Sequence, residues 1–312
     1  MNSLKKGYIF GIIGAALYGS NPLFALPLYE MGMQAGQVLF YRYLIAIVMM
    51  AIVLKVKKES FKINRSECRV LLVMGLFFSI SSFSLFKSYD FMAAGLATAL
   101  QFIYPALVVL LMSVFLKEHL SFKTIGIIMM TLMGVLMLYH GNSEEPLSTK
   151  GLFFVLLSAL LYAVYLVGVN FSVLKEMSCY KLSFYTLVFG LIVYIVNLQT
   201  TSSFAIPPTA SWKYLIALAA LPSNVSLLFT ALALRLIGST KTSILGVFEP
   251  LTAIFIGCLV FHEAMTVRIV IGVITIIVAV STLILSQSTE KSPKRSSHVN
   301  PILKFAMRLR QK

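Results

Sequence analysis

Charged residues are scarce in this chain, and acidic residues are scarcer still. Asp, Glu, Lys and Arg together make up 12% of the 312 residues, and only 11 residues are acidic. Soluble domains carry roughly 25% charged residues, most of them at the surface in contact with water. This deficit excludes a soluble globular protein.

Cysteines are also rare, and the common metal and nucleotide motifs are missing. The three cysteines, Cys68, Cys179 and Cys258, are far apart and form no CxxC pair. An odd number without metal-ligand spacing argues against a disulfide framework, so we interpret them as small apolar residues. The chain contains no HExxH pair and no GxxxxGK[ST] phosphate loop, which argues against a nucleotide-driven pump. We therefore expect no cofactor, no metal site and no catalytic residues.

Apolar residues dominate the chain instead. They make up 59% of it, and the mean hydropathy is +0.90. The apolar runs are roughly 18 to 23 residues long, as a helix needs to cross a bilayer core of about 30 Å. We predict an all-α integral membrane protein with ten transmembrane helices. The runs lie near residues 8–28, 36–54, 69–88, 92–115, 122–140, 151–171, 180–199, 212–234, 240–261 and 267–287.

The basic residues between these runs predict the orientation of the protein in the membrane. If the amino terminus is cytoplasmic, the cytoplasmic segments carry 21 basic residues and the outer segments carry 4. Cytoplasmic loops of membrane proteins carry an excess of Lys and Arg. We therefore place both termini in the cytoplasm. The net charge of +15 reflects this orientation, so no nucleic-acid partner is expected.

Two halves of the chain repeat one another. Residues 101–118 and 246–263 are apolar stretches that each have a Pro near the start and a Glu at the end. The two prolines are 145 positions apart, as are the two glutamates, and a shift of 144 places Tyr18 on Tyr162 in another segment. A constant offset over several segments indicates an internal repeat. Each repeat holds five spans, an odd number, so the second copy enters the membrane from the opposite side and the repeats are inverted.

The repeat also predicts the domain boundaries. The first five-helix repeat covers residues 1–141, the second covers 150–287, and a basic cytoplasmic tail covers 288–312. As a helix, the end of the tail would separate basic from apolar residues, which suits a position on the anionic lipids of the inner leaflet. A disordered tail that only sets topology fits the same composition equally well.

These features resemble a known family. Two inverted five-helix halves, a Pro early in the fourth and ninth helices with a Glu at each helix end, and an Arg early in the second helix resemble the EamA family of the drug/metabolite transporter superfamily. The resemblance covers about residues 7–287. It implies a secondary transporter of the bacterial inner membrane that works by alternating access, often an exporter of amino acids or related metabolites. It does not identify the substrate, since proteins of one fold carry different cargo.

Two charged residues lie well inside predicted spans, away from their ends. Glu249 is near the middle of the ninth span, directly before Pro250 and at the position that Tyr104 occupies in the first repeat. Arg42 is about six residues, or about 9 Å, inside the outer end of the second span. Ionisable groups at such places are functional candidates. Glu249 is expected to bind a cation or a proton, or else to be a protonated packing residue. Arg42 binds a substrate carboxylate, pairs with Glu249, or snorkels to the outer interface.

Further polar residues complete the predicted substrate site. Amide and phenol groups can bind ammonium and carboxylate groups, although the same groups also hold membrane helices together. Pro105 and Pro250 interrupt helices at equivalent places, which points to a transporter binding site, and we predict them as hinges. The predicted substrate-binding residues are Tyr18, Asn21, Arg42, Gln101, Tyr104, Tyr165, Asn224 and Glu249, with Tyr162 as a further lining residue.

Other functional classes stay open at this point. A membrane-embedded enzyme would need a nucleophile, a metal or an acid–base set, but His119, His140 and His262 fall at span ends and His298 in the tail. A channel usually has rings of charged residues, and a non-transporting scaffold is a further alternative. A transporter would have a small-molecule substrate and the lipid bilayer as partners, with proton coupling as an option. The oligomeric state is open.

Overall fold

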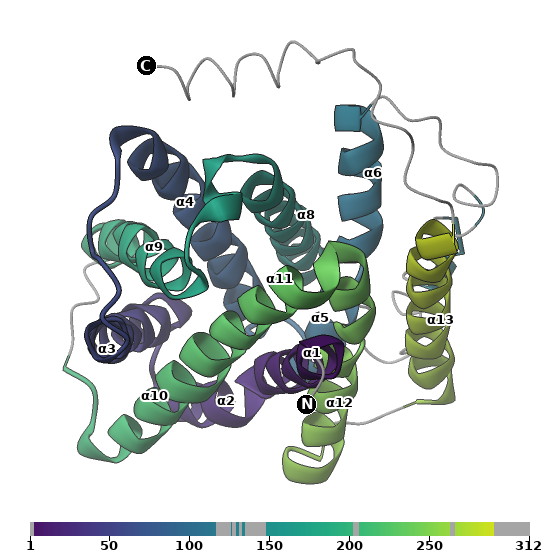
Figure 1. The fold of residues 1–312 in the computed structure, drawn as a ribbon. Coiled ribbons are helices and arrows are strands. Elements are labelled where there is room, and N and C mark those ends of the chain that lie inside the picture. The colour runs from purple at the N-terminus through teal and green to yellow at the C-terminus, as the bar shows by residue number, and fades with distance from the viewer. Residues whose placement is uncertain are drawn as a thin grey trace.

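Helices make up the fold in a computed structural model of the chain (Figure 1). The structure describes residues 3–116, 126, 129–130, 133–134, 148–201, 206–262 and 266–289, and these ranges contain no strand. The α-helices are α1 (Ser3–Gly19), α2 (Asn21–Glu30), α3 (Ala35–Val56), α4 (Arg65–Ser88), α5 (Ala94–Gln101), α6 (Tyr104–Leu116), α8 (Thr149–Phe171), α9 (Cys179–Thr201), α10 (Trp212–Leu218), α11 (Ser226–Leu245), α12 (Phe248–Val260) and α13 (Val267–Thr289). The π-helix η3 (Ala219–Val225) joins α10 to α11, and short 3-10 helices precede α9 and α10, namely η1 (Val173–Glu176) and η2 (Thr209–Ser211).

Seven segments of the described chain are long and apolar enough to cross a bilayer. They are Leu4–Glu30, Ala35–Val56, Arg65–Ser88, Ala94–Leu111, Thr149–Phe171, Cys179–Thr201 and Thr209–Ile237. Two shorter apolar helices follow, Phe248–Val260 and Val270–Ala279. The predicted all-helical membrane class is therefore confirmed.

Several predicted features fall on residues that the structure does not describe. They are the fifth span at 122–140, apart from five of its residues, the terminal glutamates Glu118 and Glu263, the linker at 141–146, and the tail from residue 290. The count of ten spans and the contact of the tail with lipid therefore stay predictions.

The helix does not break between the predicted eighth and ninth spans, and the predicted start of the ninth span near 240 is wrong. The eighth run was expected to end near residue 234 and the ninth to begin near 240, but α11 continues without a break to Leu245. No proline interrupts residues 235–245, and a helix need not stop where its sequence becomes polar. The first run is divided instead, because Ser20 separates α1 from α2 just before Asn21 and Pro22.

Two interrupted helices occupy corresponding places in the two halves. The helix α5 ends at Gln101 and α6 begins at Tyr104, while α11 ends at Leu245 and α12 begins at Phe248. Pro105 and Pro250 each lie in the first turn after the interruption. Proline fits a first helical turn, where its missing N–H would have no partner in the helix. The prolines therefore start the second segments rather than kink a continuous helix.

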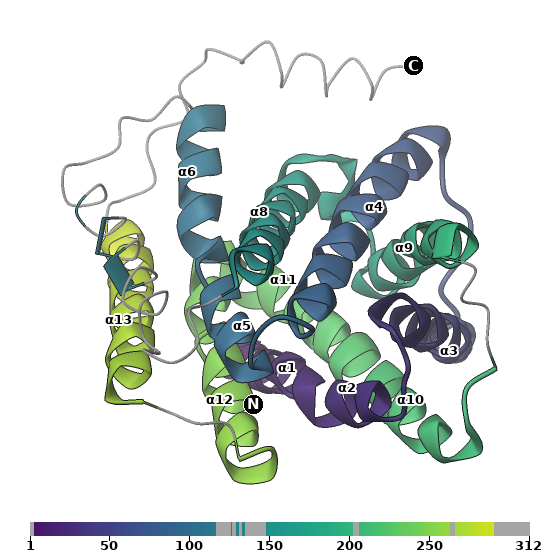
Figure 2. The ribbon, with the colours of Figure 1, turned by 180° about the vertical axis from the view of Figure 1, so that it is seen from behind.

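The two halves also make the same contacts on each other. Helix α1 packs against α11, and α4 packs against α8 (Figures 1 and 2). The Ser81 hydroxyl donates to the Ser158 carbonyl oxygen at 2.8 Å, and the Ser226 hydroxyl donates to the Gly14 carbonyl oxygen at 2.8 Å. These donors are 145 positions apart and the acceptors are 144 apart. One hydrogen bond thus occurs twice, once from each half to the other.

Candidate functional site

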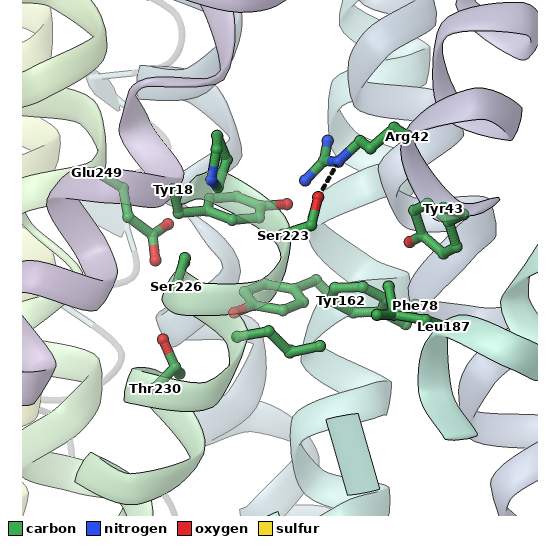
Figure 3. A pocket seen from close by; sticks show the side chains of 12 residues that line it. Tyr18, Arg42, Tyr43, Phe78, Tyr162, Leu187, Ser223, Ser226, Thr230 and Glu249 are labelled. Atoms are coloured by element: carbon green, nitrogen blue, oxygen red, sulfur yellow. Dashed lines mark hydrogen bonds between the residues drawn. The ribbon is translucent and has the colours of Figure 1, made fainter. Parts of the chain in front are cut away.

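A pocket lies where the two halves meet, and Figure 3 shows the side chains that line it. Its cavity volume, counted as the space open to the centre of a water molecule, is about 20 Å³. Helices α1, α3 and α4 of the first half and α8, α9, η3, α11 and α12 of the second half contribute side chains. The lining residues are Tyr18, Arg42, Tyr43, Phe78, Tyr162, Leu187, Pro222, Ser223, Ser226, Leu227, Thr230 and Glu249.

Equivalent residues of the two halves meet beside this pocket. The rings of Tyr18 and Tyr162, which are 144 positions apart, stack with their centroids at 6.3 Å and an interplanar angle of 3°. Tyr104 and Glu249 are 145 positions apart, and the Tyr104 hydroxyl donates to Glu249 Oε1 over a long 3.4 Å. Residues related by a repeat touch each other only near the axis that relates the two copies. The pocket therefore lies beside that axis, and the substitution of an acid for tyrosine makes it chemically asymmetric.

Glu249 is the acidic group of the pocket. It is 6% exposed and lies in the first turn of α12, where the positive end of the helix dipole favours a negative charge. Within the described residues the one ion pair joins Lys87 to Asp90 at the surface, so no basic side chain compensates Glu249. A buried carboxylate without a basic partner calls for a bound cation or a proton.

Arg42 is the basic group of the pocket. It is 3% exposed, which contradicts the snorkelling alternative. Its Nε atom donates to Ser223 Oγ at 2.5 Å, and its guanidinium carbon lies 5.3 Å from the centre of the Phe86 ring. Among the described residues, the buried Nη1 atom has no hydrogen-bond partner. Arg42 is also not paired with Glu249, since the two lie on opposite sides of the Tyr18 ring (Figure 3).

Five predicted substrate residues lie outside the pocket lining; Tyr104 bonds to Glu249, and the other four bond to or pack against protein groups. Asn21 Nδ2 donates to the Tyr18 carbonyl oxygen at 2.7 Å, and Asn224 Nδ2 donates to the Ala46 carbonyl oxygen at 3.1 Å. Gln101 Nε2 donates to Ser158 Oγ at 2.8 Å, and the Tyr165 ring packs 4.9 Å from that of Phe78. Of the predicted set, the structure brings together Tyr18, Arg42 and Glu249, with Tyr104 bonded to Glu249 and Tyr162 in the lining.

Sequence reasoning missed much of the lining, above all the segment around Pro222. The missed lining residues are Tyr43, Phe78, Leu187, Pro222, Ser223, Ser226, Leu227 and Thr230. One signal was available, because Pro222 stands inside an otherwise continuous apolar run and is followed by small polar residues. No cluster of three His, Cys, Asp or Glu side chains that could hold a metal ion occurs in the part of the chain that the structure describes.

Gly19 allows α1 to approach the acidic residue closely. A Cβ atom at this position would overlap the Glu249 carbonyl oxygen, and a backbone atom cannot rotate away. We expect Gly19→Val to destabilise the protein by roughly 1–3 kcal/mol, the usual cost of overpacking. Thermal unfolding in detergent measures the effect. Gly126→Ala is the control, because its Cβ would meet open space, and equal melting temperatures for Gly19→Val and wild type would contradict the close approach.

Comparisons with known proteins agree with this architecture. The sequence model of the EamA-like transporter family matches residues 5–140 and again 149–285. An uncharacterized transporter of Archaeoglobus fulgidus is 25% identical over 207 residues, which is 65% of this chain and 72% of the relative. The uncharacterized transporter YoaV of Bacillus subtilis is 24% identical over 247 residues, 75% of this chain and 82% of YoaV. A protein of known crystal structure superposes with a TM-score of 0.68 over 92% of this chain and 99% of its own, at 14% identity.

Proposed function

Because the chain belongs to the EamA-like transporter family, we propose that it is a secondary carrier of small zwitterionic metabolites, such as amino acids, and that the pocket between its halves binds them. The chain is a multi-pass membrane protein of the drug/metabolite transporter superfamily. Its substrate, direction and mechanism are the proposal.

The separation of one acid and one base across a single pocket carries the proposal. Arg42 and Glu249 line the pocket from opposite sides of the Tyr18 ring, and no ion pair joins them (Figure 3). An amino acid carries a carboxylate and an ammonium group. Arg42 would bind the carboxylate, which its planar donor group matches, and Glu249 would bind the ammonium. The aromatic rings of Tyr162 and Phe78 would contact the side chain of the substrate.

The arrangement of the halves supports alternating access. The reciprocal serine hydrogen bonds and the two helices interrupted before Pro105 and Pro250 are the features expected of ten helices in two inverted repeats. In such carriers the repeats rock around a central site and open it to one side at a time. The family-model ranges support the proposed repeats at 1–141 and 150–287. The hinge role of the two prolines belongs to the same proposal.

Location, transport direction and coupling are further parts of the proposal. The excess of basic residues in the segments assigned to the cytoplasm supports a protein of the bacterial inner membrane with both termini inside. Export of the metabolite is the proposed direction, on the ground that many members of the family are exporters. Glu249 would couple transport to the proton gradient if it exchanges an ammonium group for a proton during the cycle. The tail after residue 288 would rest on anionic lipids of the inner leaflet.

Counterflow tests this function directly. Liposomes that contain the purified protein are preloaded with one of the twenty amino acids or with the corresponding decarboxylated amine. Uptake of the same compound in labelled form is then followed. We expect transient accumulation with one class of amino acid and much less with the corresponding amine, because the amine lacks the group that Arg42 binds. Folded protein that gives no accumulation with any compound would overturn the proposal. Equal accumulation of amino acid and amine would remove the carboxylate from recognition.

A further inference from the structure

We propose that Ser223 is a positioning residue for substrate recognition, because it holds the Arg42 guanidinium by Nε and leaves the buried Nη1 without a partner among the described residues. The proposal rests on the proposed function, in which Arg42 binds an anionic group. Ser223 lies in the π-helix η3 and lines the same pocket (Figure 3). Three contacts of its hydroxyl and of Arg42 carry the argument.

The Leu218 carbonyl oxygen fixes the direction in which the Ser223 hydroxyl donates, because a carbonyl oxygen can only accept. Pro222 has no N–H to offer this carbonyl from four residues on, and the segment is a π-helix, which bonds residues five apart. The Ser223 hydroxyl donates to this carbonyl oxygen at 2.9 Å. A hydroxyl has one proton. Since that proton is donated to the Leu218 carbonyl oxygen, Ser223 Oγ can only accept hydrogen bonds from its other neighbours.

Arg42 supplies the donor that this oxygen accepts. Arg42 Nε and Ser223 Oγ are 2.5 Å apart, although the residues are 181 positions apart in the chain and come from different halves. Both residues are buried, so water does not compete for the bond. A guanidinium can only donate, and an oxygen with its own proton pointed elsewhere is its natural partner. The Leu218 carbonyl oxygen, through the Ser223 hydroxyl, thus determines where the Arg42 side chain is held.

The remaining contacts of Arg42 leave part of its donor set unused. The Phe86 ring lies against the guanidinium, with the carbon atom 5.3 Å from the ring centre, a cation–π distance. Nη1 is buried and has no partner in the part of the chain that the structure describes. Burying a charged donor without a partner is costly, so a group kept in this condition is suited to a ligand that arrives later. A carboxylate matches the planar fork of guanidinium donors.

A set of variants separates positioning from a purely structural role. Ser223→Ala removes both hydrogen bonds, whereas Ser223→Thr keeps the hydroxyl. The double variant Pro222→Ala/Ser223→Ala restores an N–H that can bond to the Leu218 carbonyl but leaves Arg42 Nε without an acceptor. We expect KM for the amino acid with the strongest counterflow to rise about tenfold in Ser223→Ala and in the double variant. Ser223→Thr should be close to wild type, and maximal rates should change little.

The control is Ser88→Ala, because that buried hydroxyl bonds only within its own helix, to the Leu85 carbonyl oxygen at 2.6 Å. Recovery of KM in the double variant, or a wild-type KM in Ser223→Ala, would overturn the proposal. A second readout is the NMR signal of the Arg42 Nε–H, assigned by its loss in Arg42→Lys. This proton should exchange slowly with water in the wild type and rapidly in Ser223→Ala.

The two readouts distinguish failure of this inference from failure of the proposed function. Silence of the wild-type protein with every compound in the counterflow panel would overturn the carrier function. The NMR signal would then test the positioning role by itself. An unchanged exchange rate of the Arg42 Nε–H in Ser223→Ala would show that Ser223 does not hold Arg42. Active wild-type transport with an unchanged signal would refute the positioning role alone.

Discussion

Replacing Glu249 with glutamine should raise KM for the transported amino acid about tenfold to a hundredfold. A hydrogen bond to a charged group contributes about 1.5–3 kcal/mol, and each 1.36 kcal/mol is a factor of ten. Glutamine preserves the shape of the side chain and can still accept the hydrogen bond of Tyr104. The substitution therefore removes the negative charge that we assign to the substrate ammonium, and KM in liposomes measures the loss.

The pH dependence of the same variant gives an independent check. Only the ionised form of Glu249 attracts an ammonium group, so the apparent affinity of the wild type should fall as protons compete at low pH. Glutamine does not titrate, and the pH profile of Glu249→Gln should lose this acid limb. Glu30→Gln is the matched control, because Glu30 is an exposed carboxylate at the end of α2. Wild-type affinity and an unchanged pH profile in Glu249→Gln would remove the carboxylate from the mechanism.

Arg42→Ala should produce the other large effect, a loss of preference for amino acids over their amines. Arg42 is the buried base of the pocket, and no described residue is a hydrogen-bond partner of its Nη1. Without it, we expect KM for the amino acid to rise by about tenfold to a hundredfold, while any weak transport of the amine changes little. Counterflow of the amino acid and its amine, measured side by side, tests this.

Arg42→Lys refines the test because lysine keeps the charge and loses the planar donor group. A carboxylate recognised through two N–H groups is bound poorly by lysine, so this variant should also lose affinity. Arg69→Ala is the control, since Arg69 is an exposed basic residue near the start of α4. A normal preference for the amino acid in Arg42→Ala, with folding verified by thermal unfolding, would show that another group binds the carboxylate.

The interrupted helices show how far local sequence can predict this fold. Apolar length and a constant offset are properties of the chain itself, so the helical membrane class and the equivalence of Pro105 and Pro250 followed from the sequence. The break before each proline also has a local cause, the missing N–H. The end of α11 at Leu245 was not predicted, because the polar residues before it resemble a loop, although Gly246 directly after Leu245 is a common helix-stop signal.

The same division applies to the site. Glu249 and Arg42 stood out because a charge inside an apolar span is costly, and such a charge can be recognised from the sequence alone. Asn21 and Gln101 have the same polar character as pocket residues, yet they bond to Tyr18 and Ser158 and lie outside the lining. Residue type does not reveal whether an amide faces a neighbouring helix or a cavity.

The sequence by itself determined that this protein is a helical membrane transporter built from a repeat, because hydropathy, spacing and family motifs belong to the chain. Tertiary structure alone decided that Arg42 is anchored by Ser223 from the other half, that it stays apart from Glu249, and that Tyr18 stacks on its own repeat counterpart, Tyr162. These contacts join residues far apart in the chain. They depend on how the helices of the two halves pack, and no local pattern encodes the distance between two side chains on different helices.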